Sequence, residues 1–249
     1  MKHNLIITLF LSFVLLGCIQ DKKPLVIGHR GAMGHETENT LASVRKAMEL
    51  GADMIEIDVF QCRSKEIIVF HDEKLDRLTN GEGFIEDFSV FQLKSLTVNG
   101  GHKIPLLQDV LKVIDKKCRL NIELKGKNTA DRVNHILTYY IEKKGWKPEN
   151  FLISSFDENL VREFHALNKE IPIGILTMDD PEKALKTARE LQAESIHAYY
   201  ETLTAKKVKT LQKEGFKVYV GVVNAPEDIK KMKALGVDGI FTNFPERIW

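Results

Sequence analysis

Short apolar runs alternate along the chain with stretches in which apolar residues recur at helical spacing. The apolar runs predict eight strands, centred near Val26, Ile57, Ile122, Leu152, Ile175, Ile196, Val220 and Ile240. The helical spacing predicts helices over residues 40–50, 106–114, 129–144, 158–168, 181–191, 203–214 and 226–235. A chain of eight strand–helix units and about 230 residues is typical of a single (β/α)8 TIM barrel.

The main alternative for this order of elements is an open doubly wound sheet. Such a sheet usually carries a glycine-rich phosphate-binding turn after its first strand. This chain instead has Gly28-His29-Arg30-Gly31 at that point, which is not that motif. The last strand is followed by only about eight residues, so the final helix of the barrel is expected to be missing or rudimentary.

A β-hairpin is predicted after the second strand. The connection over residues 61–66 is too short for a parallel crossover, so residues 67–70 are expected to fold back antiparallel. A bend centred on residues 63 and 64 would place His71 opposite Glu56, on the face of the strand that also carries Asp58. The alternative is an acidic strand end that is solvated or salt-bridged, with the histidine in a turn.

A segment without clear periodicity follows the hairpin, over residues 73–105. It holds four glycines and three phenylalanines. Its length predicts a functional loop or a small cap inserted into the barrel domain.

Polar side chains gather where the predicted strands end, and this is where (β/α)8 barrels carry their active sites. They are His29, Arg30, Glu56, Asp58, Glu123 and Lys125, with Asn243 after the last strand. Three carboxylates without a cysteine ligand favour a hard divalent cation, Mg²⁺ or Ca²⁺. Arginine and lysine suit phosphate oxygens, and His29 and His71 can transfer protons near neutral pH. Together these groups predict phosphodiester cleavage.

Each of these residues could instead have a purely structural role. Arg30 could pair with Glu38 or Glu56, Lys125 could form a salt bridge with Glu123, and Asn243 could serve only the turn before Pro245. Their joint placement at strand ends favours a site, because independent structural roles do not require it. The other histidines do not lie beside further polar groups at the ends of predicted strands. They are therefore expected to be structural or surface residues: His35, His102, His135, His165 and His197.

Composition narrows the choice of partners. The 249 residues include 36 Lys and Arg against 35 Asp and Glu, so no overall basic field favours binding to nucleic acid. With 43% hydrophobic residues the chain can bury one large core or two small ones. Cys62 and Cys118 show no metal-binding spacing, and a disulfide between them is possible but unsupported.

The N-terminus predicts a targeting segment. The apolar run from Leu5 to Leu16 suits a signal peptide and is shorter than the roughly 20 residues of a membrane span. Leu15-Leu16-Gly17-Cys18 resembles a bacterial lipobox, which implies a signal peptide over 1–17, a lipidated linker over 18–23 and a barrel domain over 24–249. By this interpretation, lipid on Cys18 anchors the protein in the cell envelope, and the membrane is a partner through that anchor alone. The alternative is an ordinary cleaved signal peptide.

The ordered set of motifs resembles the glycerophosphodiester phosphodiesterase family over about Leu25 to Pro245. The motifs are His29-Arg30-Gly31, Glu38-Asn39-Thr40, Glu56-Ile57-Asp58, His71-Asp72, Leu75 to Gly83, Ile104-Pro105-Leu106, Glu123-Leu124-Lys125 and Thr242-Asn243-Phe244-Pro245. The family consists of TIM barrels that use a divalent cation to hydrolyse glycerophosphodiesters to sn-glycerol 3-phosphate and an alcohol.

The resemblance implies roles for individual residues. It implies His29 and His71 as general acid and base, Glu56, Asp58 and Glu123 as metal ligands, and Arg30 and Lys125 as phosphate contacts. Asn224 and Asn243 are expected to contact substrate.

Two positions depart from the family pattern. Thr37 stands where the family usually has proline, and Gly221 stands where it tends to have tryptophan. The second departure bears on head-group preference. Two other activities stay open: a lysophospholipase D or phosphoinositide-type phosphodiesterase on the same barrel, and a non-catalytic lipoprotein that binds glycerophosphodiesters.

Overall fold

Eight parallel strands form a closed barrel in the computed structural model, which describes residues 23–249. The strands are β1 (Leu25–Gly28), β2 (Met54–Gln61), β4 (Arg119–Leu124), β5 (Phe151–Ser155), β6 (Ile173–Thr177), β7 (Ser195–Tyr199), β8 (Lys217–Gly221) and β9 (Gly239–Thr242). Each pairs with its neighbours, and the barrel closes because β1 pairs with both β2 and β9. The predicted TIM barrel is thereby confirmed. The predicted signal peptide and Cys18 lie outside the described residues.

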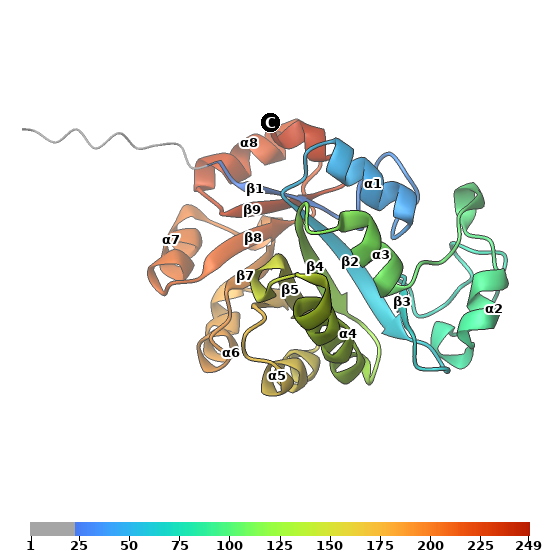
Figure 1. Ribbon diagram of the computed structural model, residues 1–249. Coiled ribbons are helices and arrows are strands. Elements are labelled where there is room, and N and C mark those ends of the chain that lie inside the picture. The colour runs from blue at the N-terminus through green and yellow to red at the C-terminus, as the bar shows by residue number, and fades with distance from the viewer. Residues whose placement is uncertain (1–22) are drawn as a thin grey trace, which may run out of the picture.

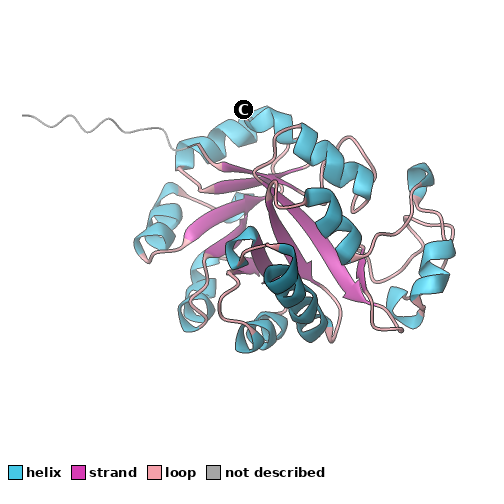
Figure 2. Ribbon diagram, in the orientation of Figure 1, coloured by secondary structure: helices cyan, strands magenta, loops and turns pink. Residues whose placement is uncertain are grey.

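The helices pack outside the strands (Figures 1 and 2). They are α1 (Leu41–Glu49), α3 (Leu107–Ile114), α4 (Thr129–Lys144), α5 (Glu158–Leu167), α6 (Leu185–Glu190), α7 (Ala205–Lys213) and α8 (Pro226–Leu235). Single 3-10 turns lie in three of the connections between strands and helices: η3 (Pro148–Asn150), η4 (Pro181–Ala184) and η5 (Tyr200–Thr202). Only η6 (Pro245–Ile248) follows β9, as the short C-terminal segment predicts. Within residues 23–249, no helix combines the length and the hydropathy that a bilayer crossing requires.

Successive side chains along each strand point alternately to the outside and to the inside of the barrel wall. On β4, Leu120, Ile122 and Leu124 face the helices and join the large core between strands and helices. The barrel interior holds a smaller cluster of Ile27, Met54, Leu152, Tyr219 and Phe241. The inward positions of β2 and β4 become polar towards their carboxyl ends, so polar side chains line the barrel mouth.

The hairpin forms, but its predicted register was wrong by one residue. β3 (Ile67–Val69) runs antiparallel to β2 and pairs Val69 with Val59, which would put position 71 opposite Ile57. The turn holds three residues instead of two, because Lys65 adopts a left-handed φ of 72°. His71 nevertheless lines the pocket at the barrel mouth, since β3 ends at Val69 and the chain bends over residues 71–73.

Residues 73–105 form a small lobe beside the barrel, here called the insertion. It contains η1 (Ile85–Asp87), α2 (Val90–Ser95) and η2 (Asn99–Gly101), and Figure 1 shows α2 apart from the ring of helices. Its apolar residues pack with the hairpin in a separate cluster that includes Leu75, Leu78, Phe60 and Cys62. Both Cys62 and Cys118 are free thiols, so the possible disulfide is not formed.

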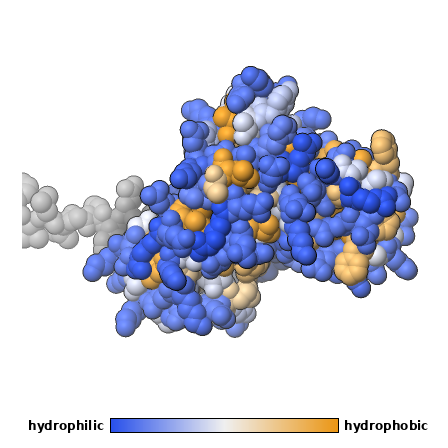
Figure 3. Space-filling view, turned by 90° about the horizontal axis from the view of Figure 1, so that it is seen from below, coloured by the Kyte–Doolittle hydropathy of each residue, from blue (hydrophilic) through white to orange (hydrophobic). Residues whose placement is uncertain are grey.

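The face of the molecule seen in Figure 3 is mostly hydrophilic. The insertion, the right-hand lobe in that view, carries some of the exposed hydrophobic side chains. Phe91 on α2 is 86% exposed.

Candidate active site

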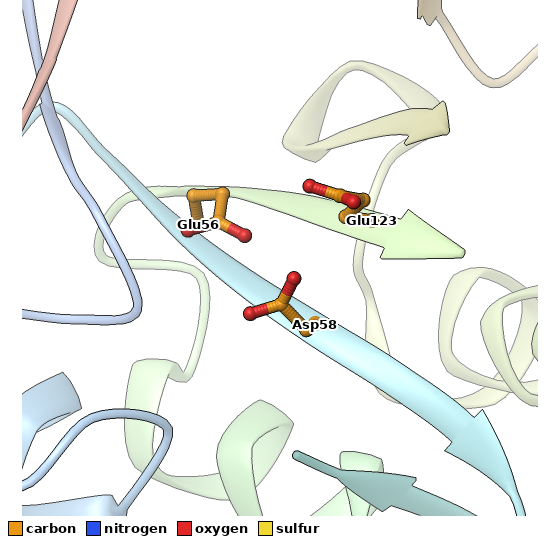
Figure 4. A group of neighbouring side chains, drawn as sticks. All are labelled: Glu56, Asp58 and Glu123. Carbon is orange, nitrogen blue, oxygen red and sulfur yellow. The ribbon is translucent and has the colours of Figure 1, made fainter. Parts of the chain in front are cut away.

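Three carboxylates meet at the mouth of the barrel. Asp58 on β2 lies in register with Glu123 on β4, and Glu56 lies one inward position before Asp58. The side chains converge between the two strands in Figure 4. One ligand atom from each residue can be chosen so that all lie within 4.8 Å of one another. All three side chains are buried.

Without a nearby positive charge, ionising all three carboxyl groups costs free energy, because they are buried and repel one another. Burial, followed by the charges of Asp58 and Glu123, raises the pKa of Glu56 well above its ordinary value. Burial, and then Asp58, raises the pKa of Glu123 to about 7. Glu56 Oε1 is buried and has no hydrogen-bond partner. An all-oxygen donor set with an unpartnered carboxylate oxygen fits a hard divalent cation such as Mg²⁺ or Ca²⁺.

Cation binding is therefore expected to release protons near neutral pH. Carboxyl groups with raised pKa values are partly protonated in the cation-free protein, and a bound cation requires them ionised. The apparent Kd for Mg²⁺ or Ca²⁺ should rise as pH falls from about 8 to 6. Calorimetric titration in buffers of different ionisation enthalpy measures the proton release. Affinity that does not change with pH, with no proton release in any buffer, would contradict this interpretation.

Arg30 is held at the mouth by an unusual backbone conformation. It has a φ of 50°, and its N–H donates to Glu56 Oε2 over 2.7 Å. Its Nη1 donates to Glu38 Oε1 over 2.6 Å, and its Nε lies 3.4 Å from Asp58 Oδ2. The pairing with Glu38 that the sequence offered as a structural alternative is present, and the guanidinium still lines the pocket. Asn39 Nδ2 also donates to Asp58 Oδ2, over 2.9 Å.

The two predicted histidines are each oriented through Nδ1. His29 Nδ1 lies 2.8 Å from Asn243 Oδ1, and His71 Nδ1 lies 2.6 Å from Asp72 Oδ1. Both partner oxygens are acceptors, so we infer that each Nδ1 carries the proton and that each Nε2 is left for the site. Burial, and then the charge of Arg30, lowers the pKa of His29 to about 4. His29 is therefore neutral near pH 7.

Lys125 links the carboxylates to His71. Its Nζ lies 3.1 Å from Glu123 Oε1, 3.8 Å from Asp58 Oδ1 and 3.4 Å from His71 Nε2. Burial opposes its charge, but Glu123 and Asp58 outweigh burial and raise the pKa of Lys125. The salt bridge between Lys125 and Glu123 considered from the sequence is present, at the same mouth as the other groups.

A pocket of about 450 Å³ opens over these groups. One wall is polar and is lined by His29, Arg30, Glu56, His71, Glu123 and Lys125. The opposite wall is largely apolar and comes from the ends of β5 to β9: Phe156, Leu176, Met178, Tyr199, Tyr200 and Phe241. The pocket thus has two chemically different halves.

The apolar wall was not anticipated from the sequence. Its residues follow or end apolar strand runs, so position at a strand end is the only sequence signal they carry. Gly221 stands where the family tends to have tryptophan, and a Cβ added to Gly221 would lie 2.6 Å from Phe241 Cβ. Phe241 therefore supplies an aromatic surface close to the position at which the family tends to have tryptophan.

The remaining predicted residues lie around the pocket. Asn224 Oδ1 accepts hydrogen bonds from Asn243 N (2.8 Å) and Thr242 Oγ1 (3.2 Å), which fixes the turn after β9. Neither asparagine is among the residues that line the pocket, so their substrate contacts stay predictions. His197 does line it, but its Nε2 lies 2.8 Å from Ser195 Oγ, and burial lowers its pKa to about 3.

Comparison with known proteins points to one family. A family model described as the glycerophosphoryl diester phosphodiesterase family matches residues 29–247. A glycerophosphodiester phosphodiesterase from Caldanaerobacter subterraneus subsp. tengcongensis is 35% identical over 235 residues, which cover 91% of this chain and 96% of that protein. A human lysophospholipase D is 25% identical over 272 aligned positions, covering 89% of this chain and 84% of that protein.

A solved structure shares the fold closely. It is a phosphodiesterase from Oleispira antarctica in complex with the product sn-glycerol-3-phosphate. The TM-score is 0.83 at 27% identity, and the match covers 90% of this chain and 95% of that one.

Proposed function

Because the chain belongs to the glycerophosphoryl diester phosphodiesterase family, we propose that it hydrolyses glycerophosphodiesters such as glycerophosphocholine or glycerophosphoethanolamine to sn-glycerol 3-phosphate and an alcohol. The observation that carries the proposal is the meeting of three carboxylates, two histidines and two cationic side chains at one pocket. The product named for the Oleispira antarctica complex is consistent with it.

The polar wall suits the phosphate and the glycerol. Arg30 and Lys125 supply N–H donors for the phosphate oxygens, and both lie within 4 Å of Asp58. Glu56, Asp58 and Glu123 would hold a divalent cation, which when bound supplies Lewis-acid polarisation of phosphate and hydroxyl oxygens.

The two histidines suit opposite proton transfers. Neutral His29 accepts the proton of a glycerol hydroxyl as its oxygen attacks phosphorus. His71, held through Nδ1 by Asp72, enters this step in its protonated form and donates the Nε2 proton to the leaving alcohol oxygen as the P–O bond breaks. Water then opens the cyclic phosphate diester, with the two proton transfers reversed, to give the phosphomonoester.

The apolar wall favours a second candidate activity. A wall of aromatic and aliphatic side chains could receive an acyl chain, as in a lysophospholipase D, the activity named for the human relative. The insertion, however, contributes no residue to the pocket lining, and its buried apolar side chains pack into their own cluster. We therefore propose the small water-soluble diester as the preferred substrate.

One assay separates these activities. The protein is given glycerophosphocholine, glycerophosphoethanolamine or lysophosphatidylcholine, with Mg²⁺ or Ca²⁺, and the phosphorus products are identified by ³¹P NMR. We expect sn-glycerol 3-phosphate from both glycerophosphodiesters, and a kcat/KM on lysophosphatidylcholine that is at least about tenfold lower, a difference of about 1.4 kcal/mol in transition-state binding.

Three results would contradict the proposal. Lysophosphatidic acid as the main product would assign the lysophospholipase activity. Phosphocholine as product would place the cleavage on the other side of phosphorus. Tight binding of glycerophosphocholine without turnover, in excess of both cations, would assign the non-catalytic role.

A further inference from the structure

Arg77 belongs to the insertion, and its side chain reaches back to the barrel mouth. The adjoining residues Leu75 and Leu78 are buried in the cluster of the insertion, and Asn99 Nδ2 donates to the Arg77 carbonyl over 3.3 Å. The backbone of Arg77 is therefore fixed by the fold of the insertion. Its side chain is about half exposed, yet it makes four hydrogen bonds, all of them to two carboxylates.

The first carboxylate is the partner of His71. Arg77 Nε and Nη2 donate to Asp72 Oδ2 and Oδ1 over 2.5 and 2.9 Å, a two-pronged contact. Asp72 Oδ1 is also the acceptor for His71 Nδ1. A carboxylate on a short side chain can rotate, and the guanidinium fork removes that freedom. The orientation of the imidazole of His71 thus depends on Arg77 through Asp72.

The second carboxylate is the partner of Arg30. Arg77 Nη1 and Nη2 donate to Glu38 Oε2 and Oε1 over 2.8 and 2.9 Å. Glu38 Oε1 accepts in turn from Arg30 Nη1, and the Glu38 side chain is only 5% exposed. One guanidinium therefore holds two carboxylates, and each of these holds one of the groups that face the pocket.

We propose that Arg77 is a positioning residue for the phosphodiesterase reaction, and that through it the insertion sets the orientation of His71 and of Arg30. The inference rests on the proposed function of the site, in which His71 transfers a proton and Arg30 contacts phosphate. It assigns a role to the Leu75 to Gly83 motif, in which Arg77 lies. A purely structural salt bridge between insertion and barrel would affect stability and leave the state of His71 unchanged.

The test compares Arg77→Lys with wild type in the full chain. Lysine keeps the charge but cannot form either two-pronged contact. We expect kcat on glycerophosphocholine to fall about 10- to 100-fold, the range typical when a partner that orients a reacting group is lost. Arg63→Lys is the matched control, because Arg63 is also an arginine beside the insertion, and its guanidinium hydrogen-bonds only to Gln92 among the described residues. Its kcat should stay within about twofold of wild type.

A second measurement needs no turnover. ¹⁵N NMR of the histidine rings at high pH reports which nitrogen carries the proton. Wild type and Arg63→Lys should show His71 as the Nδ1-protonated tautomer, and Arg77→Lys should show a mixture of tautomers. Because this signature is independent of activity, it separates failure of the positioning role from failure of the proposed function.

A double substitution completes the design. If Arg77 acts on His71 through Asp72, adding Arg77→Lys to Asp72→Ala should leave the ring tautomer as in Asp72→Ala alone. The inference is overturned if folded Arg77→Lys keeps wild-type kcat and shows an unchanged His71 ring spectrum. It is also overturned if kcat falls while the His71 ring spectrum stays that of wild type.

Discussion

Replacing His29 or His71 with alanine is expected to lower kcat on glycerophosphocholine by at least about 100-fold, and by up to about 10⁴-fold, the range for loss of a general acid or base. The reason is geometric, because both rings line the pocket that Glu56 and Glu123 also line. Each ring is oriented through Nδ1 by its own acceptor, Asn243 Oδ1 for His29 and Asp72 Oδ1 for His71. Initial rates of sn-glycerol 3-phosphate release, on protein shown to be folded, give the measurement.

His35→Ala is the matched control. His35 pairs with Glu246 over 3.1 Å and packs against Phe244, and it does not line the pocket. Its kcat should stay within about threefold of wild type. Wild-type rates in either His29→Ala or His71→Ala would refute the proton-transfer roles assigned to these residues.

Glu56→Gln is expected to remove activity and to stabilise the cation-free protein. The amide keeps the size of the side chain and an oxygen that can accept from Arg30 N, but it removes a ligand charge. Cation affinity should fall about 100-fold or more, and kcat should fall by about 10³-fold if the carboxylate is a direct ligand. In chelator at pH 8 the midpoint of thermal unfolding should rise, because a buried carboxylate with a raised pKa is replaced by a neutral group.

The sign of the stability effect follows from the pKa. A carboxyl group whose folded pKa is raised destabilises the fold at pH values above its unfolded pKa, where the unfolded chain ionises it freely. The substitution removes that cost. Glu49→Gln is the control, since Glu49 is exposed and pairs only with Lys46 among the described residues. A lower unfolding midpoint for Glu56→Gln in chelator, or unchanged cation affinity, would contradict the assignment.

The polar half of the site could be predicted because its signals are local. Alternation along β2 and β4 places carboxylates on the inward face, and barrel topology places strand ends at one mouth. His29 and Arg30 follow β1 directly. These inferences needed only periodicity and residue type.

The rest depends on features that periodicity does not encode. The hairpin register depends on whether the turn holds two residues or three, and the left-handed conformation of Lys65 decided it. The apolar wall consists of residues such as Phe156 and Met178, which resemble ordinary core residues in the sequence. The contacts of Arg77 join the insertion to Glu38, 39 positions away, and no local pattern predicts such a contact.

The most direct test of the account is the release of sn-glycerol 3-phosphate from glycerophosphocholine by the full-length protein, before chelation, after chelation, and after Mg²⁺ or Ca²⁺ is restored. The account predicts turnover that the chelator abolishes and one of the two cations restores, because Glu56, Asp58 and Glu123 form a buried carboxylate cluster that could hold a metal ion. Turnover that persists undiminished in chelator, or folded protein that releases no product with either cation, would contradict it.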